Sequence, residues 1–198
     1  MKVTGYIVQK IIFRTKIFYE DRKTSSRRVK GGAIIVCNHT SVYDFAALLF
    51  VFFGRTLRCQ MAEVLFKKRL LGLFLRAMGG VKVDRNANDY AFMDKCERIL
   101  AKKGVVLVFP EGRLPKEGEE RPLPFGPGAA YLAFRSGAPV IPVYTDGNYF
   151  GKGRARVVIG RRVYAADVCG GAGEAEDLEK FSSYLRGEII ALGESMNG

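Results

Sequence analysis

Histidine is nearly absent from this sequence, because His39 is the only one among 198 residues. A metal centre held by several histidines is therefore excluded. Cysteine is also scarce, and none of the four forms a C-x-x-C pair, so we expect no zinc site. The four are Cys37, Cys59, Cys96 and Cys169. We expect the protein to work without a metal and without a cofactor.

Long hydrophobic runs are missing too. The longest is FAALLFVFF at residues 45–53, whereas a helix that spans a bilayer needs about 20 apolar residues. No stretch is typical of a cleavable secretory signal. We therefore predict no transmembrane helix, a buried core helix at 45–53, and a reduced, cytosol-facing setting.

The motifs of three large enzyme classes are also absent from the sequence. It has no G-x-S-x-G, which marks a serine nucleophile on a strand-to-helix turn. It has no G-x-x-x-x-G-K-[ST] for nucleoside phosphates and no G-x-G-x-x-G after a predicted strand for dinucleotides. Chemistry of these kinds is not expected here.

Positive charge is present in excess, with 32 Lys and Arg against 20 Asp and Glu and a net charge of +12. Residues 1–30 carry nine basic and two acidic residues, whereas residues 170–198 carry two basic and six acidic ones. A basic surface favours an anionic partner, such as nucleic acid, anionic lipid or an acidic protein. A nucleic-acid-binding domain is one hypothesis. Because no binding motif or row of stacking aromatics accompanies the basic residues, we expect no nucleic-acid partner.

Strand-like and helix-like patterns alternate after the basic N-terminal segment. Short apolar, often β-branched runs predict strands at 33–37, 57–62, 81–84, 105–109, 140–145 and 155–160. Apolar residues at helical spacing predict helices at 45–53, 64–78, 88–103, 129–135 and 174–196, with a long loop at 110–128. This alternation predicts one α/β domain over residues 31–198, with a largely parallel central sheet flanked by helices.

Three polar motifs follow predicted strands directly. NHTSVYD (38–44) follows the strand at 33–37, FPEGR (109–113) follows the strand at 105–109, and GGVKVDR (79–85) ends in Arg85 after another strand. In sheets of this kind a ligand usually binds beyond the carboxyl ends of the strands. The three motifs therefore indicate a common site.

His39 and Asp44 can form a pair only if the histidine lies outside a helix. On a helix, five steps of about 100° would leave the two side chains about 140° apart. We therefore place His39 in the loop and Asp44 in the first helical turn, with Thr40 or Ser41 as the helix cap. Such a carboxylate can orient a histidine that acts as a general base. The alternative is a histidine packed at a strand end beside an unrelated capping aspartate.

In order and spacing, NHTSVYD, GGVKVDR, FPEGR and VIPVY resemble the four blocks of the glycerolipid acyltransferase superfamily. The closest similarity is to bacterial 1-acyl-sn-glycerol-3-phosphate acyltransferases, over residues 30–165. The resemblance implies transfer of a fatty acyl group to the free hydroxyl of lysophosphatidic acid, which gives phosphatidic acid. The donor would be acyl-CoA or acyl-acyl carrier protein, and no acyl-enzyme would form.

The resemblance also implies roles for single residues. His39 would be the general base and Asp44 would orient it. Substrate-binding residues would be Asn38, Arg85, Glu111, Gly112 and Arg113.

One departure from the family pattern leaves the acceptor open. The family usually has Thr and then Arg after Phe-Pro-Glu-Gly, whereas here Arg113 comes at once and Leu114 follows. Another lyso-lipid, such as an amino-acid-containing one, therefore stays an alternative acceptor. A catalytically inactive membrane-binding relative is the remaining alternative.

The first 30 residues predict a membrane-associating segment. Val3, Ile7, Ile11 and Phe18 share one face of an expected amphipathic helix at 3–18, and basic residues accompany them. This pattern suits an interfacial helix on anionic lipid, and the alternative is a helix that covers the core. Leucines and cations at 65–78 are a second candidate surface. We expect peripheral or monotopic attachment to the cytoplasmic face of the cell membrane.

Overall fold

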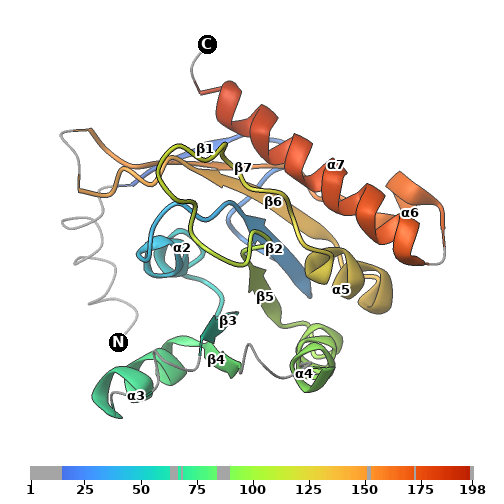
Figure 1. The fold of residues 1–198 in the computed structure, drawn as a ribbon, viewed down its shortest axis with the longest axis horizontal. Helices are drawn as coiled ribbons and strands as arrows, with labels where there is room; N and C mark the ends of the chain where they lie inside the picture. Colours follow the sequence, from blue (N-terminus) through green and yellow to red (C-terminus); the bar gives the residue numbers. More distant parts are fainter. Residues whose placement is uncertain are drawn as a thin grey trace.

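The computed structural model describes residues 15–62, 67, 69–83, 90–150, 153–171 and 173–196. In these residues seven strands form one sheet in the order β1-β7-β6-β2-β5-β3-β4 (Figure 1). Only β6 and β7 pair antiparallel, and the other neighbours pair parallel. The predicted α/β fold with a largely parallel sheet is therefore confirmed. The strands are β1 (Lys16–Tyr19), β2 (Ala33–Cys37), β3 (Leu57–Ala62), β4 (Gly80–Val83), β5 (Val105–Val108), β6 (Val140–Thr145) and β7 (Arg156–Ile159).

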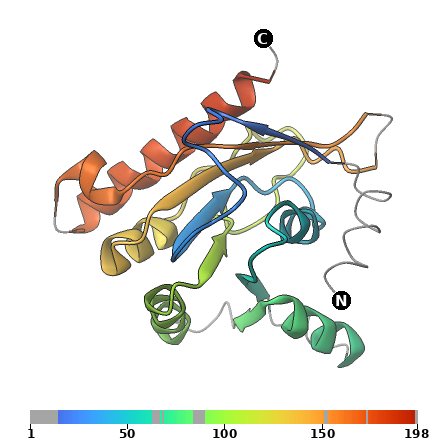
Figure 2. The ribbon, with the colours of Figure 1, turned by 180° about the vertical axis from the view of Figure 1, so that it is seen from behind.

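Helices connect the strands and cover the sheet (Figures 1 and 2). The strands predicted at 33–37, 57–62 and 140–145 have these same bounds in the structure. The short helix α6 was not predicted. The helices are α2 (Asp44–Val51), α3 (Arg69–Met78), α4 (Tyr90–Ala101), α5 (Gly128–Ser136), α6 (Ala165–Cys169) and α7 (Ala175–Glu194).

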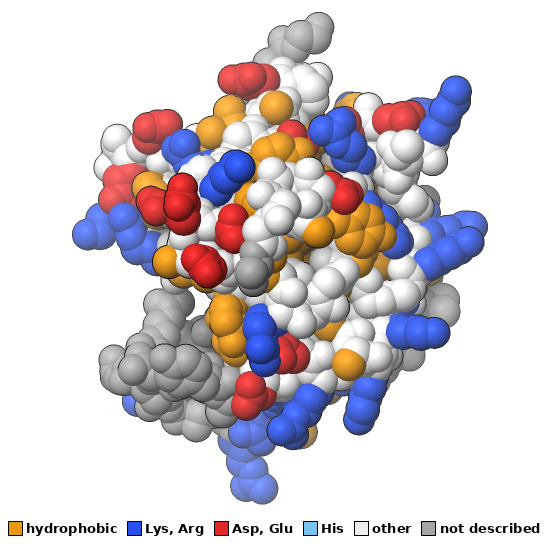
Figure 3. Space-filling view, turned by 90° about the vertical axis from the view of Figure 1, so that its right-hand side faces the viewer, with side chains coloured by type: hydrophobic (Ala, Val, Ile, Leu, Met, Phe, Trp, Pro, Cys, Tyr) orange, Lys and Arg blue, Asp and Glu red, His pale blue; other side chains and the backbone are white. Residues whose placement is uncertain are grey.

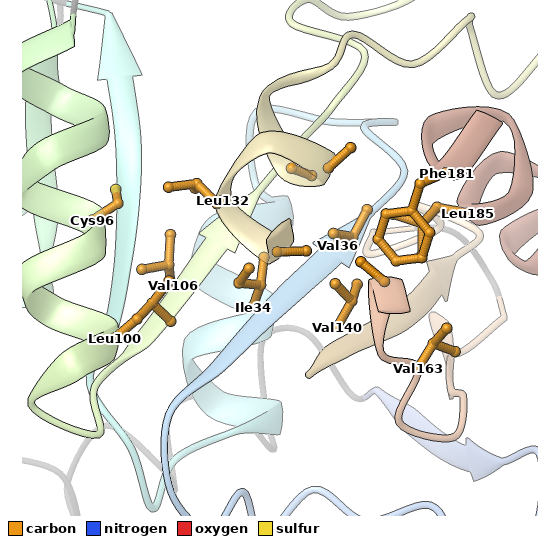
Figure 4. Close-up of a cluster of buried hydrophobic side chains, with 14 of the residues drawn as sticks. Ile34, Val36, Cys96, Leu100, Val106, Leu132, Val140, Val163, Phe181 and Leu185 are labelled. Carbon is orange, nitrogen blue, oxygen red and sulfur yellow. The ribbon is translucent and has the colours of Figure 1, made fainter. Parts of the chain in front are cut away.

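Strand β2 runs through the centre of the sheet and is buried on both faces, which is why its sequence, AIIVC, is apolar throughout. Successive side chains point to opposite faces. Ile34 and Val36 pack into the hydrophobic core on one face of the sheet. Ile35 packs into the core on the other face, where Leu48 and Phe52 from the α2 region cover the sheet. Figure 4 shows the first core, in which side chains from α4, α5 and α7 meet the sheet, among them Cys96, Leu100, Leu132, Phe181 and Leu185.

The expectation for the N-terminal segment needs a correction at residues 16–18. These residues were placed in an amphipathic helix, but they begin β1, which pairs parallel with β7. Ile17 and Tyr19 are half-buried, while Lys16 and Phe18 are exposed. This period of two is that of a strand with one packed face. Residues 1–14 lie outside the described residues, so the predicted helix there and the membrane role of residues 1–30 stay predictions.

The topology brings several loops to one edge of the sheet. Strand β2 lies between β5 and β6 and is parallel to both, so all three strands end at the same edge. The loops that leave them at Cys37, Val108 and Thr145 therefore meet there. This edge is where the polar motifs were expected.

Candidate active site

His39 and Asp44 are in contact. Nδ1 of His39 lies 2.8 Å from Oδ2 of Asp44. Helix α2 begins at Asp44, so the carboxylate lies in the first turn and reaches back to a histidine in the loop. The histidine side chain is 22% exposed and the aspartate side chain is fully buried. The site thus offers one solvent-reachable ring held by one buried carboxylate.

The start of α2 differs from the expected one. Thr40 or Ser41 was expected to cap this helix, but its N-cap is Tyr43, without a side-chain capping bond. Instead, the backbone N–H groups of Thr40 and Ser41 donate to Asp44 Oδ2 at 2.7 and 2.9 Å. The Thr40 hydroxyl donates to Oδ1 at 3.1 Å. The loop is thus folded around the carboxylate, and the Ser41 hydroxyl accepts only the N–H of the N-cap residue Tyr43, at 3.2 Å.

The hydrogen bond to Asp44 decides which ring nitrogen of His39 can act as a base. A carboxylate only accepts, so Nδ1 carries the proton of the neutral ring and Nε2 keeps a lone pair. The ring also stacks on Phe109, with centroids 4.4 Å apart and planes at 21°. The ring is thus held at one edge by Asp44 and on one face by Phe109, and its role as a general base stays a prediction.

Glu111 joins the loops that follow β2 and β5. Its Oε1 accepts the backbone N–H of His39 at 2.6 Å, and its Oε2 accepts the N–H of Leu123 at 2.9 Å. Gly112, at φ 69°, turns the chain directly after it, and such a φ favours glycine. In this structure Glu111 therefore holds the histidine backbone in place. Substrate contacts by Glu111 and Gly112 stay predictions.

Asn38 connects the ends of β2 and β6. Its Nδ2 donates to the Thr145 carbonyl at 2.9 Å, and its Oδ1 accepts the Thr145 N–H at 2.8 Å. The residue is 3% exposed. Both ends of the amide are thus used to fasten two loops of the site, and a substrate contact by Asn38 stays a prediction.

Two arginines, Arg85 and Arg113, were expected to bind the substrate, and the structure describes only the second. Arg85 lies outside the described residues. Arg113 forms a fork with Glu119, with Nη1–Oε2 and Nη2–Oε1 distances of 2.7 Å each. The hydrogen bonds from Arg113 hold the pKa of Glu119 down to about 2. The guanidinium is therefore engaged within its own loop, and its contact with a substrate stays a prediction.

Tyr149 is a site residue that the sequence reasoning missed. Its hydroxyl donates to Asp44 Oδ1 at 2.7 Å and lies 3.0 Å from the Thr145 hydroxyl. It is 4% exposed. Burial, with the charge of Asp44 nearby, raises the pKa of Tyr149 far above its ordinary value, so the group stays a donor. The available signal was position, since TDGNY (145–149) starts at the same sheet edge as the other motifs.

No group of three or more His, Cys, Asp and Glu side chains that could hold a metal ion occurs within the described residues. The four cysteines are free thiols.

Comparison with known proteins places the chain in a family. A family model described as acyltransferase matches residues 16–146. The chain belongs to the acyltransferase family. The matched stretch of this acyltransferase contains His39, Asp44 and Glu111 and ends before Tyr149.

Individual relatives of this acyltransferase carry more specific names. It is 28% identical over 146 residues to 1-acyl-sn-glycerol-3-phosphate acyltransferase beta of Homo sapiens, which covers 72% of this chain and 51% of the relative. It is 30% identical over 137 residues to the 1-acyl-sn-glycerol-3-phosphate acyltransferase of Limnanthes alba, covering 67% and 48%. The enzyme of that name from Bacillus subtilis is 25% identical over 141 residues, which are 69% of each chain. The chain thus spans about half the length of the first two relatives.

A solved structure shows the same fold. The crystal structure of the 1-acyl-sn-glycerophosphate acyltransferase PlsC of Thermotoga maritima superposes with a TM-score of 0.69 at 22% identity. The match covers 98% of this chain and 78% of that one. At this identity the likeness supports the architecture of the acyltransferase and not a substrate.

Proposed function

We propose that the protein transfers a fatty acyl group from an acyl thioester to the free hydroxyl of lysophosphatidic acid and so forms phosphatidic acid. The observation that carries this proposal is the 2.8 Å contact between His39 Nδ1 and Asp44 Oδ2 in a member of the acyltransferase family. The names of the relatives support the acceptor, because several are 1-acyl-sn-glycerol-3-phosphate acyltransferases.

In the proposed reaction, Nε2 of His39 takes the proton from the acceptor hydroxyl. The hydroxyl oxygen attacks the thioester carbonyl carbon, a C–O bond forms and the C–S bond breaks. The proton on Nε2 then passes to the departing thiolate, so the ring returns to its neutral form and no acyl-enzyme arises. The charge of Asp44 stabilises the imidazolium between the two transfers.

For the donor we propose acyl-CoA or acyl-acyl carrier protein. Both carry negative charge, and a chain with a net charge of +12 attracts either. A direct comparison of the two donors at equal concentration distinguishes them.

One observation favours a second acceptor. The Arg113 fork is occupied by Glu119, so a guanidinium that would suit a phosphate is already neutralised. This arrangement supports an acceptor without the glycerol phosphate, such as an amino-acid-containing lyso-lipid.

An acceptor panel tests the proposal. Purified protein is incubated with each labelled donor and either lysophosphatidate or an amino-acid lyso-lipid, and the products are quantified. Turnover of lysophosphatidate supports the main proposal, whereas turnover of the other lyso-lipid alone would replace it with the second. If neither acceptor reacts with either donor, the acyltransferase proposal is wrong for this chain.

A variant pair then examines Arg113. If Arg113 leaves Glu119 to hold the acceptor phosphate, Arg113→Ala raises the KM for lysophosphatidate. Arg121→Ala removes another exposed cation from the same loop and serves as the control. Equal KM values in both variants would show that Arg113 does not bind the acceptor.

We also propose that the protein works at an anionic membrane surface on the cytoplasmic face. No described helix is both long and apolar enough to cross a bilayer. Three apolar side chains on the loops after β2 and β6 are exposed, namely Val42 (71%), Tyr43 (46%) and Phe150 (61%). Tyr43 and Phe150 meet edge to face, with centroids 4.8 Å apart. We call these three residues the apolar rim.

Exposed cations on segments that adjoin Tyr149 and Ala155 support an anionic partner. Ala155 packs with Tyr149, the neighbour of Phe150, in a small buried cluster. The backbone N–H of Lys16 donates to the Ala155 carbonyl at 2.7 Å, and both Lys16 and Arg154 are exposed. By contrast, the face in Figure 3 shows hydrophobic groups only in small, separate areas among charges of both signs. An exposed apolar rim together with exposed cations on nearby segments suits a lipid surface.

Vesicle binding tests the membrane proposal. The protein should sediment with vesicles that contain anionic lipid, and Phe150→Ser should weaken this binding. Tyr164→Ser, which changes a side chain that is 42% exposed at the start of α6, is the control. Equal binding by both variants would place the membrane contact elsewhere.

A further inference from the structure

The carboxylate of Asp44 is fully buried, and each of its hydrogen-bond partners is a donor. Oδ2 accepts from His39 Nδ1 and from the backbone N–H groups of Thr40 and Ser41. Oδ1 faces two hydroxyls, of which Tyr149 is the closer, at 2.7 Å against 3.1 Å for Thr40. All of these donors except Tyr149 come from the loop directly before Asp44. Tyr149 is 105 residues away in the sequence.

The hydroxyl of Tyr149 stands in a chain of hydrogen bonds with one direction. Because the Asp44 carboxylate can only accept, Tyr149 gives it its single proton. The Thr145 hydroxyl, at 3.0 Å, must then donate to Tyr149, and it accepts the Gly147 N–H at 3.3 Å. Bonds aligned in this way polarise one another and strengthen the last bond, which is the one on Asp44.

The chain of hydrogen bonds begins at the N–H of Gly147, and the backbone geometry there is fixed. Gly147 has a φ of +67°, and a Cβ at this position would overlap the Thr40 hydroxyl. The loop after β6 therefore packs directly against the loop that carries His39. The N–H of Tyr149 closes the turn by donating to the Gly147 carbonyl at 2.9 Å. The ring lies in a small buried cluster with Ala47 of α2 and Ala155, so the hydroxyl has little freedom to leave Asp44.

We propose that Tyr149 is a positioning residue that acts through Asp44 on the catalytic histidine. Its hydroxyl restrains Oδ1, so that Oδ2 stays aimed at Nδ1 of His39 and the ring stays in the form with a free Nε2. Tyr149 does not touch the reacting atoms in this account. The expected effect of Tyr149 on kcat rests on the proposed acyl transfer. Its expected effect on the protonation form of the His39 ring does not.

Kinetics of Tyr149→Phe give the first test. The variant keeps the ring and its packing and removes only the donor. Because the lost bond is to a charged group, kcat should fall by about tenfold while KM stays within about twofold. Tyr144→Phe is the matched control. It removes a hydroxyl from β6, where the ring packs against Gly193 of α7 rather than near Asp44, and it should keep the wild-type kcat.

A double-mutant cycle shows whether Tyr149 works through Asp44. If it does, Tyr149→Phe causes no further loss of kcat in an Asp44→Ala background, where the hydroxyl has no side chain left to orient. An equal loss in both backgrounds would overturn the proposal and leave Tyr149 a packing residue. A Tyr149→Phe protein with the wild-type kcat would overturn it as well.

The single histidine allows a readout that needs no activity. With uniform nitrogen-15 labelling, the ring signals of His39 need no assignment, because the chain has no other histidine. Wild type and Tyr144→Phe should show the pattern of a ring protonated at Nδ1, and Tyr149→Phe should show a mixture of both neutral forms. An unchanged pattern in Tyr149→Phe would contradict the positioning role, even if the protein transferred acyl groups to no acceptor tested.

Discussion

Replacement of Asp44 by asparagine isolates the charge of the carboxylate from its shape. Three N–H donors face the Oδ2 position, from His39, Thr40 and Ser41. The amide oxygen of the asparagine must therefore take this place. The amide nitrogen then takes the Oδ1 position, where it faces hydroxyl oxygens that can accept a hydrogen bond. The bond to Nδ1 survives, and with it the ring form that has a free Nε2. The variant thus loses mainly the negative charge beside the imidazolium.

The size of the effect follows from distance and burial. With Nδ1 and Oδ2 2.8 Å apart, the centres of the two charges are about 4 Å apart, where an effective dielectric constant of 20 gives about 4 kcal/mol. Water reaches the 22% exposed histidine and lowers this value, so about 2–4 kcal/mol of transition-state stabilisation should be lost. This loss corresponds to a decrease in kcat of about 30- to 1,000-fold.

The assay is steady-state acyl transfer by Asp44→Asn, with Asp94→Asn, an exposed position on α4, as the control. The unfolding temperature of each variant, measured alongside, separates loss of fold from loss of turnover. A folded Asp44→Asn protein that keeps more than about a tenth of the wild-type kcat would refute the charge-stabilisation argument.

Three further predictions concern the loops around the site. In Glu111→Gln the amide nitrogen must face one of the two backbone N–H donors, that of His39 or that of Leu123, so one hydrogen bond is lost. In acyl-transfer assays kcat should fall about tenfold, and in denaturant titrations the free energy of unfolding should fall by about 1–3 kcal/mol. Gly147→Ala combines a φ of +67° with a clash and should lose about 1–3 kcal/mol in denaturant titrations, more than Gly137→Ala, whose Cβ meets nothing within 4 Å. The lowered pKa of Glu119, about 2, predicts stability that is present above its unfolded pKa of about 4.3 and is lost as the pH falls toward 2. Acid titration of Glu119→Gln should therefore show a stability difference from wild type that closes between about pH 5 and pH 2.

The sequence predicted the sheet well because most of its strands are buried on both faces. Short, mostly apolar runs such as 33–37 and 140–145, which are rich in valine and isoleucine, show no helical period, and both strands have the predicted bounds. The edge strand β1 was missed because only half of its side chains pack, and its spacing also fits an amphipathic helix. Helix α6, with five residues, is too short to show a period.

The sequence predicted the His39–Asp44 contact because both residues lie in one motif with restricted geometry. It missed Tyr149 because this contact spans 105 residues and depends on the turn at Gly147. The expected hydroxyl cap from Thr40 or Ser41 was wrong for a local reason, because the backbone N–H groups of both residues bind the carboxylate of Asp44 and the helix begins later, with Tyr43 as its N-cap. The contact between Tyr149 and Asp44 depends on how two distant loops meet after folding, which local sequence patterns do not encode.

The central claim is that His39 takes the proton from the hydroxyl of a lyso-lipid. The most direct measurement is the rate of lysophosphatidate acylation by wild type and His39→Ala, with circular dichroism to verify the fold. Loss of a general base should lower kcat by at least about 10²-fold. A folded His39→Ala protein with near-normal turnover would contradict the account.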